Sequence, residues 1–221
     1  MPRRPSGPAD TVADTIADTP TVSAAGARPA LILASTSRYR RELLARLRLP
    51  FEVIAPDVDE SALAAEAPAD LARRLSRAKA AAVAMQHPDA VVIGSDQVCE
   101  VDGEAIGKPG THERAVQQLR RLSAQRAVFH TSVCVMRRST GYESHAAAPV
   151  VVRFRTLQPA EIEHYLRTEQ PYDCAGSAKC ETLGIALLEA IESDDPTALV
   201  GLPLIRTARM LREAGIDPLR P

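Results

Sequence analysis

The chain has 221 residues, of which 45% are hydrophobic and 25% are charged, and this composition predicts a folded protein with one domain. Its 27 basic and 28 acidic residues give a net charge of −1, which argues against a broad basic surface for duplex DNA or a membrane, although not against a local basic pocket. No run of about eighteen apolar residues occurs, so no membrane span is expected.

The first strand is predicted over residues 30–34, and Ser37 is placed to cap a helix that runs to about Leu47. A second strand is expected over residues 51–54. A long, Ala-rich helix follows over residues 68–86, with proline in its first turn.

The apolar run over residues 90–94 predicts a strand that is covered on both faces. The dipeptide Asp102-Gly103 between residues 98–101 and 105–106 is a strong hairpin signal. The remaining predicted elements are helices over 112–122, 159–168 and 203–214, and long antiparallel strands over 128–137 and 144–155. Because strands both alternate with helices and pair as hairpins, an α/β domain with a mixed sheet is expected over residues 29–221.

Residues 1–28 are rich in Pro, Ala, Thr, Ser and Asp, and no apolar stretch of a secretory signal follows Arg3 and Arg4. This composition predicts a disordered N-terminal extension. The four cysteines contain no Cys-x-x-Cys pair, so reduced and mostly buried thiols are expected rather than a zinc site or a disulfide framework. The reducing cytoplasm is therefore the predicted compartment.

The segment Ser35–Arg41 lies where the first strand is followed by a helix. Serine hydroxyls, the backbone N–H groups of Ser37–Arg40 and the positive end of the helix all favour an anion there. Arg40 and Arg41 add planar donors suited to phosphate oxygens. A capped helix with exposed arginines is the structural alternative, and this segment alone does not decide between the two.

Two lysines are candidates for phosphate contacts. Lys108 follows Gly107 in a turn that is no P-loop, because Gly103 stands one residue too close and Pro109 replaces the Ser or Thr. It can still act as a point charge, although a plain surface turn fits equally well. Lys79 stands among alanines on a helix that otherwise looks buried, so it either reaches water along the surface or points into the same pocket.

Carboxylates follow two of the predicted strands. Asp96 comes just beyond the apolar run 90–94, at the kind of strand end where ligands gather in α/β sheets. The loop Asp57–Glu60 holds three carboxylates, and magnesium sites combine one or two carboxylates with substrate phosphates. A turn-forming aspartate and a solvated acidic loop are the alternatives. Together with the basic residues, these groups suit metal-assisted attack on a phosphoanhydride.

A series of short motifs runs along the chain. They are Leu33-Ala34-Ser35-Thr36-Ser37 with Arg40-Arg41, Asp59-Glu60, Lys79-Ala80, Gly94-Ser95-Asp96, Gly107-Lys108-Pro109, Ala175-Gly176 and Val200-Gly201-Leu202-Pro203-Leu204. With these motifs in this order, the chain resembles the Maf-type nucleoside triphosphate pyrophosphatases over about residues 30–218.

The resemblance implies a mixed α/β fold with an elongated, twisted sheet and a deep nucleotide cleft, often in a homodimer. It also implies hydrolysis of nucleoside triphosphates to monophosphate and pyrophosphate with a divalent cation, Mg²⁺ or Mn²⁺. The implied phosphate-binding residues are Ser35, Arg40, Lys79 and Lys108, and the implied metal ligands are Glu60 and Asp96. Asp96 matches the proton acceptor for the attacking water.

Two branches of the family differ in their base preference. The branch that acts on dTTP and UTP usually carries Thr and Arg where this chain has Gln97 and Tyr39. Gln97 and Glu181, the latter within the small-residue segment that begins at Cys174, resemble the branch that hydrolyses N7-methyl-GTP, a modified nucleotide whose removal is a house-cleaning activity. That branch commonly has Trp where Tyr39 stands, so the chain departs from the pattern but keeps an aromatic ring.

Physical chemistry favours the same branch. The ring of N7-methylguanine is positively charged, so the face of Tyr39 attracts it with roughly 0.5–2 kcal/mol. Glu181 is suited to accept from the N–H groups of the base, and Gln97 is expected to donate to its O6 atom. A surface position for Tyr39 and a solvated loop for Glu181 are the alternatives.

Two rival functions are a dTTP or UTP pyrophosphatase of the same family and a nucleotide-binding regulator of cell division without significant turnover. Nucleic-acid binding is disfavoured by the near-zero net charge.

Overall fold

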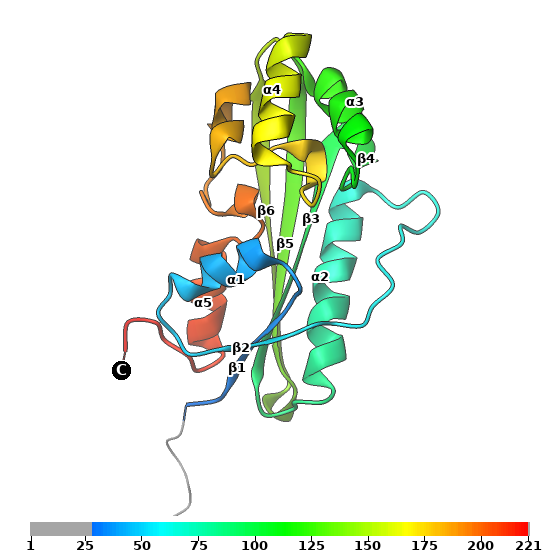
Figure 1. Ribbon diagram of the computed structural model, residues 1–221. Coiled ribbons are helices and arrows are strands. Elements are labelled where there is room, and N and C mark those ends of the chain that lie inside the picture. The colour runs from blue at the N-terminus through cyan, green and yellow to red at the C-terminus, as the bar shows by residue number, and fades with distance from the viewer. Residues whose placement is uncertain (1–27, 221) are drawn as a thin grey trace, which may run out of the picture.

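The computed structural model describes residues 28–220, so the predicted disordered extension lies, apart from Arg28, outside the described residues. One mixed sheet contains seven strands in the order β2-β1-β3-β5-β6-β7, with β4 paired to β3. The strands are β1 (Leu31–Ala34), β2 (Glu52–Ile54), β3 (Val91–Val101), β4 (Glu104–Ile106), β5 (Arg126–Arg137), β6 (Tyr142–Phe154) and β7 (Leu188–Glu192). The prediction of an α/β fold with an elongated mixed sheet is confirmed, and Figure 1 shows β3, β5 and β6 running along the length of the molecule.

Five α-helices flank the described part of the sheet. They are α1 (Arg38–Ala45), α2 (Pro68–Ala84), α3 (His112–Leu122), α4 (Pro159–Glu169) and α5 (Leu204–Glu213). Four short 3-10 helices complete the described elements: η1 (Arg138–Thr140), η2 (Ala175–Ser177), η3 (Leu183–Leu187) and η4 (Ala198–Val200). None of the described helices has the length and apolar character needed to cross a membrane.

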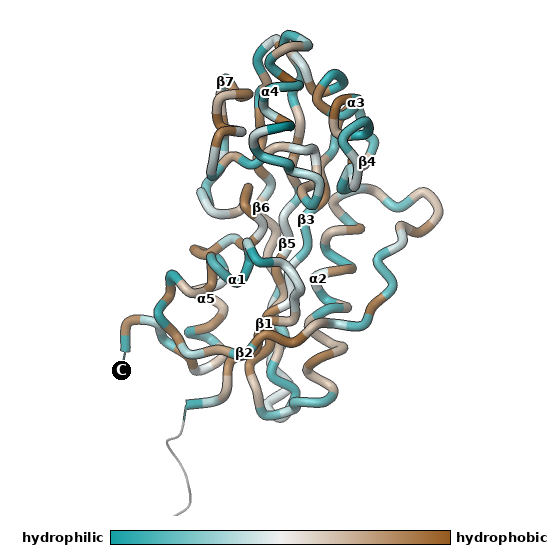
Figure 2. Tube along the Cα trace, in the orientation of Figure 1, coloured by the Kyte–Doolittle hydropathy of each residue, from teal (hydrophilic) through white to brown (hydrophobic). Residues whose placement is uncertain are grey.

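The helices cover the described sheet in three larger apolar clusters, and a small fourth cluster joins the start of α2 to Val98 of β3. At the end where β1 lies, α1 and α5 pack on one face, and α2 packs on the other. At the opposite end, α3 and α4 enclose the far halves of β3, β5 and β6. Hydrophobic and hydrophilic segments alternate along these helices in Figure 2, whereas β1 is hydrophobic throughout. The functional cavity described below lies where the two ends meet.

The hairpin signal is confirmed, since Asp102 and Gly103 adopt φ angles of 53° and 80° between β3 and β4. Both long antiparallel strands are also confirmed as β5 and β6. The predicted break after Gly94 is wrong. Strand β3 continues through its polar residues because β5 pairs with it from Val92 to Glu100. Strand β7 was not predicted at all.

Candidate active site

A cavity of about 520 Å³ lies between the sheet, α1, α2 and the loops that follow β4 and α4. Every side chain to which the family resemblance gives a role in the site lines this cavity. These residues are Ser35, Tyr39, Arg40, Glu60, Lys79, Asp96, Gln97, Lys108 and Glu181. They come from segments far apart in the sequence, and the topology explains how they meet.

Asp96 lies in the middle of β3, not beyond its end. The parallel partner β1 stops at Ala34, opposite Gly94, so Asp96 stands two residues past the point where β1 ends. The cavity therefore forms at the carboxyl end of β1, as ligand sites in α/β sheets usually do, while β3 continues behind it.

Gly94 brings α2 close to β3. A Cβ atom at this position would lie 2.3 Å from the carbonyl oxygen of Ser76 and 2.5 Å from the backbone nitrogen of Ala80, so any larger residue would push the helix away. Lys79 lies between these two contacts on α2. The close approach sets its ammonium group against Asp96, which is two residues beyond Gly94 on the strand.

Lys79 is the buried centre of a charge network that we call the Lys79 group: Arg40, Glu60, Lys79, Asp96 and Lys108. The Lys79 Nζ atom lies 2.7 Å from Oδ1 of Asp96 and 2.7 Å from Oε1 of Glu60. Arg40 Nη2 lies 4.0 Å from the same Oδ1 atom. The side chains of Lys79 and Asp96 are only 5% and 10% exposed, so their charges are weakly screened by water.

The charges of this group act on one another. Burial opposes ionisation of Glu60, but the hydrogen bond from Lys79 and the positive charges of Lys79, Lys108 and Arg40 outweigh it and lower the pKa of Glu60. Burial also lowers the pKa of the Arg40 guanidinium, and the carboxylates of Asp96 and Glu60 oppose this shift. Glu60 is therefore an ionised carboxylate at neutral pH.

Arg40 is fixed by a backbone contact. Its Nε atom donates to the carbonyl oxygen of Gly201 at 3.0 Å, and the hydroxyl of Ser95 donates to the same oxygen at 2.9 Å. Gly201 has a φ angle of 116°, which favours glycine. This contact orients the guanidinium toward Asp96.

At the start of α1, only some of the predicted donors remain free to bind an anion. Ser37 caps the helix as predicted, with its hydroxyl accepting from the Arg40 backbone N–H at 3.4 Å. The Ser35 hydroxyl accepts from the Ser37 N–H at 3.1 Å. Two of the predicted backbone donors, those of Ser37 and Arg40, are therefore already bonded. The remaining N–H groups of the first turn belong to Arg38 and Tyr39, and the Ser35 hydroxyl retains its own proton to donate.

Gln97 has a fixed orientation. Its Nε2 atom donates to Thr131 Oγ1 at 2.9 Å and to the carbonyl oxygens of Ala198 and Leu199 at 2.9 and 3.0 Å. With the amide turned the other way, its oxygen would face two carbonyl oxygens. The sequence led to the expectation that Gln97 donates to a bound base, but in this arrangement the amide hydrogens are bonded within the chain and Oε1 remains as an acceptor.

A second set of polar side chains lines the cavity from the start of α1 and from the loop over residues 173–181, and we call it the Tyr39 group: Arg38, Tyr39, Asp173, Cys174 and Glu181. The Tyr39 hydroxyl accepts from Arg38 Nη2 at 2.7 Å and donates to Asp173 Oδ1 at 3.2 Å. The Cys174 thiol lies 3.4 Å from the same hydroxyl. Burial raises the pKa of Tyr39, so the phenol is neutral. Arg38 and Asp173 were not predicted from the sequence. Asp173 is 134 residues from Tyr39 in the chain, so their contact depends on the course of the loop that carries Asp173.

Three residues of the predicted polar segments do not reach the cavity. Arg41 is exposed and is not among the lining residues. From the acidic loop only Glu60 lines the cavity, whereas Asp59 accepts from the Ser61 N–H at 2.9 Å and Asp57 is not a lining residue. The loop therefore supplies one carboxylate rather than three.

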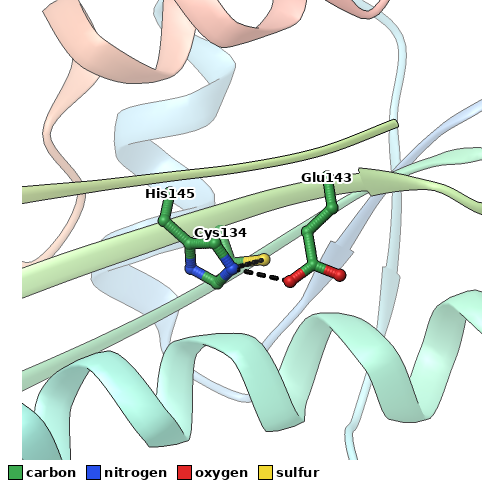
Figure 3. Close-up of side chains that lie close together, drawn as sticks. All are labelled: Cys134, Glu143 and His145. Carbon is green, nitrogen blue, oxygen red and sulfur yellow. Dashed lines mark hydrogen bonds and ion pairs between the residues drawn. The ribbon is translucent and has the colours of Figure 1, made fainter. Parts of the chain in front are cut away.

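Another cluster of ligand-type side chains, Cys134, Glu143 and His145, lies on β5 and β6 outside the cavity (Figure 3). Glu143 Oε1 already accepts from Arg77 Nε at 2.7 Å and from His145 Nε2 at 2.8 Å. Burial raises the pKa of the Cys134 thiol to about 12, so the thiol is neutral. The Arg77 cation thus satisfies the carboxylate, and the cluster is a structural ion-pair network.

Comparison with known proteins identifies the family. The model of the Maf-like protein family matches residues 30–214. The 7-methyl-GTP pyrophosphatase of Albidiferax ferrireducens is 64% identical over 189 residues, which cover 86% of this chain and 95% of that protein. The proteins of the same name from Polaromonas sp. and Bordetella pertussis are 63% and 62% identical, and the matches cover 84% and 86% of this chain and 85% and 95% of those proteins. The chain belongs to the Maf-like protein family.

Proposed function

We propose that the chain hydrolyses N7-methyl-GTP to N7-methyl-GMP and pyrophosphate. The observation that carries this proposal is the division of charge within one cavity. The Lys79 group holds three cations and two carboxylates, and the Tyr39 group holds one cation, two carboxylates and an aromatic ring. A triphosphate suits the first group, and a positively charged base suits the second. The relatives named as 7-methyl-GTP pyrophosphatases support the same substrate.

We propose Mg²⁺ or Mn²⁺ as the cofactor, held by Glu60 and Asp96 together with substrate phosphates. The donor set fits, because two carboxylate oxygens converge on one ammonium group at 2.7 Å each and magnesium sites combine one or two carboxylates with phosphate oxygens. When bound, such a cation stabilises negative charge on the phosphates as a Lewis acid.

The residues of the Lys79 group have separate tasks in this mechanism. Arg40, Lys79 and Lys108 neutralise the charge that develops on the α-phosphate and on the leaving pyrophosphate. The Ser35 hydroxyl donates to a phosphate oxygen. Asp96 orients and deprotonates the attacking water. Its Oδ1 atom is held by Lys79, and no hydrogen bond to the described residues engages Oδ2.

The Tyr39 group recognises the base in this proposal. The Tyr39 hydroxyl is already bonded to Arg38, Asp173 and Cys174, so the residue contacts the ligand through its ring. Glu181 accepts from N1–H and N2–H₂ of the base, and its charge offsets the positive ring. Gln97 contributes its Oε1 atom as a second acceptor.

A panel of N7-methyl-GTP, GTP, dTTP and UTP tests the proposal, with Mg²⁺ and with a chelator. The expected products of N7-methyl-GTP are N7-methyl-GMP and pyrophosphate, with the highest kcat/KM of the panel and no turnover with chelator. A higher kcat/KM on dTTP or UTP would assign the chain to the other branch. Nucleotide binding without pyrophosphate release would favour the cell-division regulator.

The cytoplasm and a homodimer belong to the proposal as well. The cytoplasmic assignment rests on the absence of a Cys-x-x-Cys pair or disulfide among the described cysteines, all of which are free thiols. The homodimer rests on the family resemblance, and light scattering on the purified protein tests it.

A further inference from the structure

Arg38 and Asp173 form a charge pair at the Tyr39 ring. The guanidinium carbon of Arg38 lies 4.7 Å from the centroid of the Tyr39 ring, so one face of the ring already holds a cation. Asp173 Oδ2 lies 3.8 Å from Arg38 Nη2, and Asp173 Oδ1 accepts from the Tyr39 hydroxyl at 3.2 Å. Asp173 therefore contacts both the cation and the ring on which the cation lies.

A positively charged base would compete with Arg38. Both cations are attracted by the π-electrons of the same ring, and they repel one another because their charges are alike. Asp173 counteracts this repulsion, because its carboxylate neutralises Arg38. The guanidinium of Arg38 does not repel a neutral base such as guanine, so the charges of Arg38 and Asp173 have little effect on the binding of that base.

We infer that Arg38 and Asp173 are an opposed pair that sets the preference for a positively charged base, with Asp173 strengthening the preference and Arg38 weakening it. The inference rests on the proposed function and deepens it. Asp173 is thus a specificity-determining residue, and Arg38 holds the position on the ring that a cationic base would contest.

No other cation of the loop that carries Asp173, among the described residues, compensates the charge of Asp173. Glu181 is the other charged residue of the described chain that lines the cavity from the same loop as Asp173. The nearby Lys179 is turned away, since its Nζ atom donates to the carbonyl oxygen of Glu169 at 2.7 Å and the residue does not line the cavity.

The test is the ratio of kcat/KM for N7-methyl-GTP to that for GTP, measured in Asp173→Asn, Arg38→Gln and the double variant. Both side chains are more than half exposed, so the charge effect is screened, and we expect about a threefold fall of the ratio for Asp173→Asn and about a threefold rise for Arg38→Gln. The double variant should return close to the wild-type ratio. A ratio is insensitive to a general loss of folded enzyme.

Ionic strength separates charge from mere positioning of Tyr39. Salt shortens the screening length from about 10 Å at about 0.1 M to about 3 Å at about 1 M, so both shifts should shrink at high salt. A wild-type ratio of one or below would overturn the proposed function itself. A wild-type ratio well above one that neither variant changes, or shifts that salt leaves intact, would overturn only the role of the Arg38–Asp173 pair.

Discussion

The two halves of the cavity differ in how their charges are held. In the Lys79 group, the central side chains belong to β3 and α2, and Lys79 and Asp96 are 5% and 10% exposed. In the Tyr39 group, the side chains come from the start of α1 and the loop over residues 173–181, and Arg38 and Asp173 are 62% and 52% exposed. The centre of the Lys79 group, Lys79 and Asp96, is therefore built on secondary structure and buried, although Glu60 of the same group comes from a loop and is 56% exposed. The charge pair Arg38–Asp173 of the Tyr39 group reaches water.

This difference in burial assigns catalysis to the Lys79 group and the choice of base to the Tyr39 group. Charges that are buried and fixed act strongly on developing charge, because little water rearranges around them. Charges at an exposed loop are screened, so they shift preferences between similar ligands by smaller factors. We therefore expect changes in the Lys79 group to abolish turnover and changes in the Tyr39 group to alter the choice of base.

The largest effect is expected for Asp96→Asn. The amide cannot accept a proton from water, so kcat should fall by about 10²–10⁴ while nucleotide binding persists. Steady-state kinetics and calorimetric titration with nucleotide measure the two quantities. Asp102→Asn is the matched control, because Asp102 lies on the hairpin after the same strand, outside the cavity, in a turn that accepts Asn. Near-normal turnover of Asp96→Asn would remove the proposed base.

A smaller but still large effect is expected for Lys79→Met. The variant loses a charged donor to phosphate, removes the only close ion pair of Glu60 among the described residues and leaves Asp96 with Arg40 alone, so kcat/KM should fall by about 10²-fold. Arg77→Met provides the comparison on the same helix. Arg77 pairs with Glu143 outside the cavity, so its loss should leave kcat/KM near the wild-type value and lower stability by at most about 1 kcal/mol. Equal kinetic losses in both variants would point to damage of α2 rather than to phosphate binding.

For the Tyr39 group, Glu181→Gln should reduce the preference for N7-methyl-GTP over GTP by about tenfold. The amide keeps the shape and one acceptor but loses the charge that offsets the methylated ring, and a hydrogen bond to a charged group is worth about 1.5–3 kcal/mol. The ratio of kcat/KM values for the two nucleotides measures this change. A variant that loses activity equally on both nucleotides would show that Glu181 does not recognise the base.

The smallest expected effect is a pH dependence of stability. The pKa of Glu60 is lowered from its ordinary value of 4.5 in the folded protein, so its ionised form stabilises the fold above that pH and this contribution is lost as the pH falls through the lowered pKa. Urea unfolding of the wild type and Glu60→Gln at about pH 7 and about pH 3 tests the sign. The free energy of unfolding of the wild type should exceed that of Glu60→Gln by less at acid pH than at neutral pH. An excess that grows at acid pH would contradict the lowered pKa of Glu60.

Much of the architecture could be predicted from local patterns. The cap at Ser37, the Asp102-Gly103 hairpin and the long strands β5 and β6 all follow from signals within a few residues. The continuity of β3 could not be predicted, because its polar residues around Asp96 carry no apolar signal and depend on pairing with a distant strand.

The candidate site divides in the same way. Its phosphate-binding, metal-binding, catalytic and base-recognition residues could be assigned from the resemblance, and the structure places these residues around one cavity. What their atoms contact could not be assigned. The Gln97 amide is oriented by carbonyl oxygens about a hundred residues away in the chain, and Tyr39 is held by Asp173 across 134 residues. Such contacts depend on the course of loops that local patterns do not determine.

In the proposed mechanism the Lys79 group binds the triphosphate while the Tyr39 group binds the base. A crystal structure of Asp96→Asn with N7-methyl-GTP and Mg²⁺ tests this division most directly. The α-phosphate should lie beside Arg40 and Lys79, with the methylated base against Tyr39 and its N–H groups at Glu181. Phosphates found beside Asp173 and Glu181, or a base that contacts neither Tyr39 nor Glu181, would contradict it.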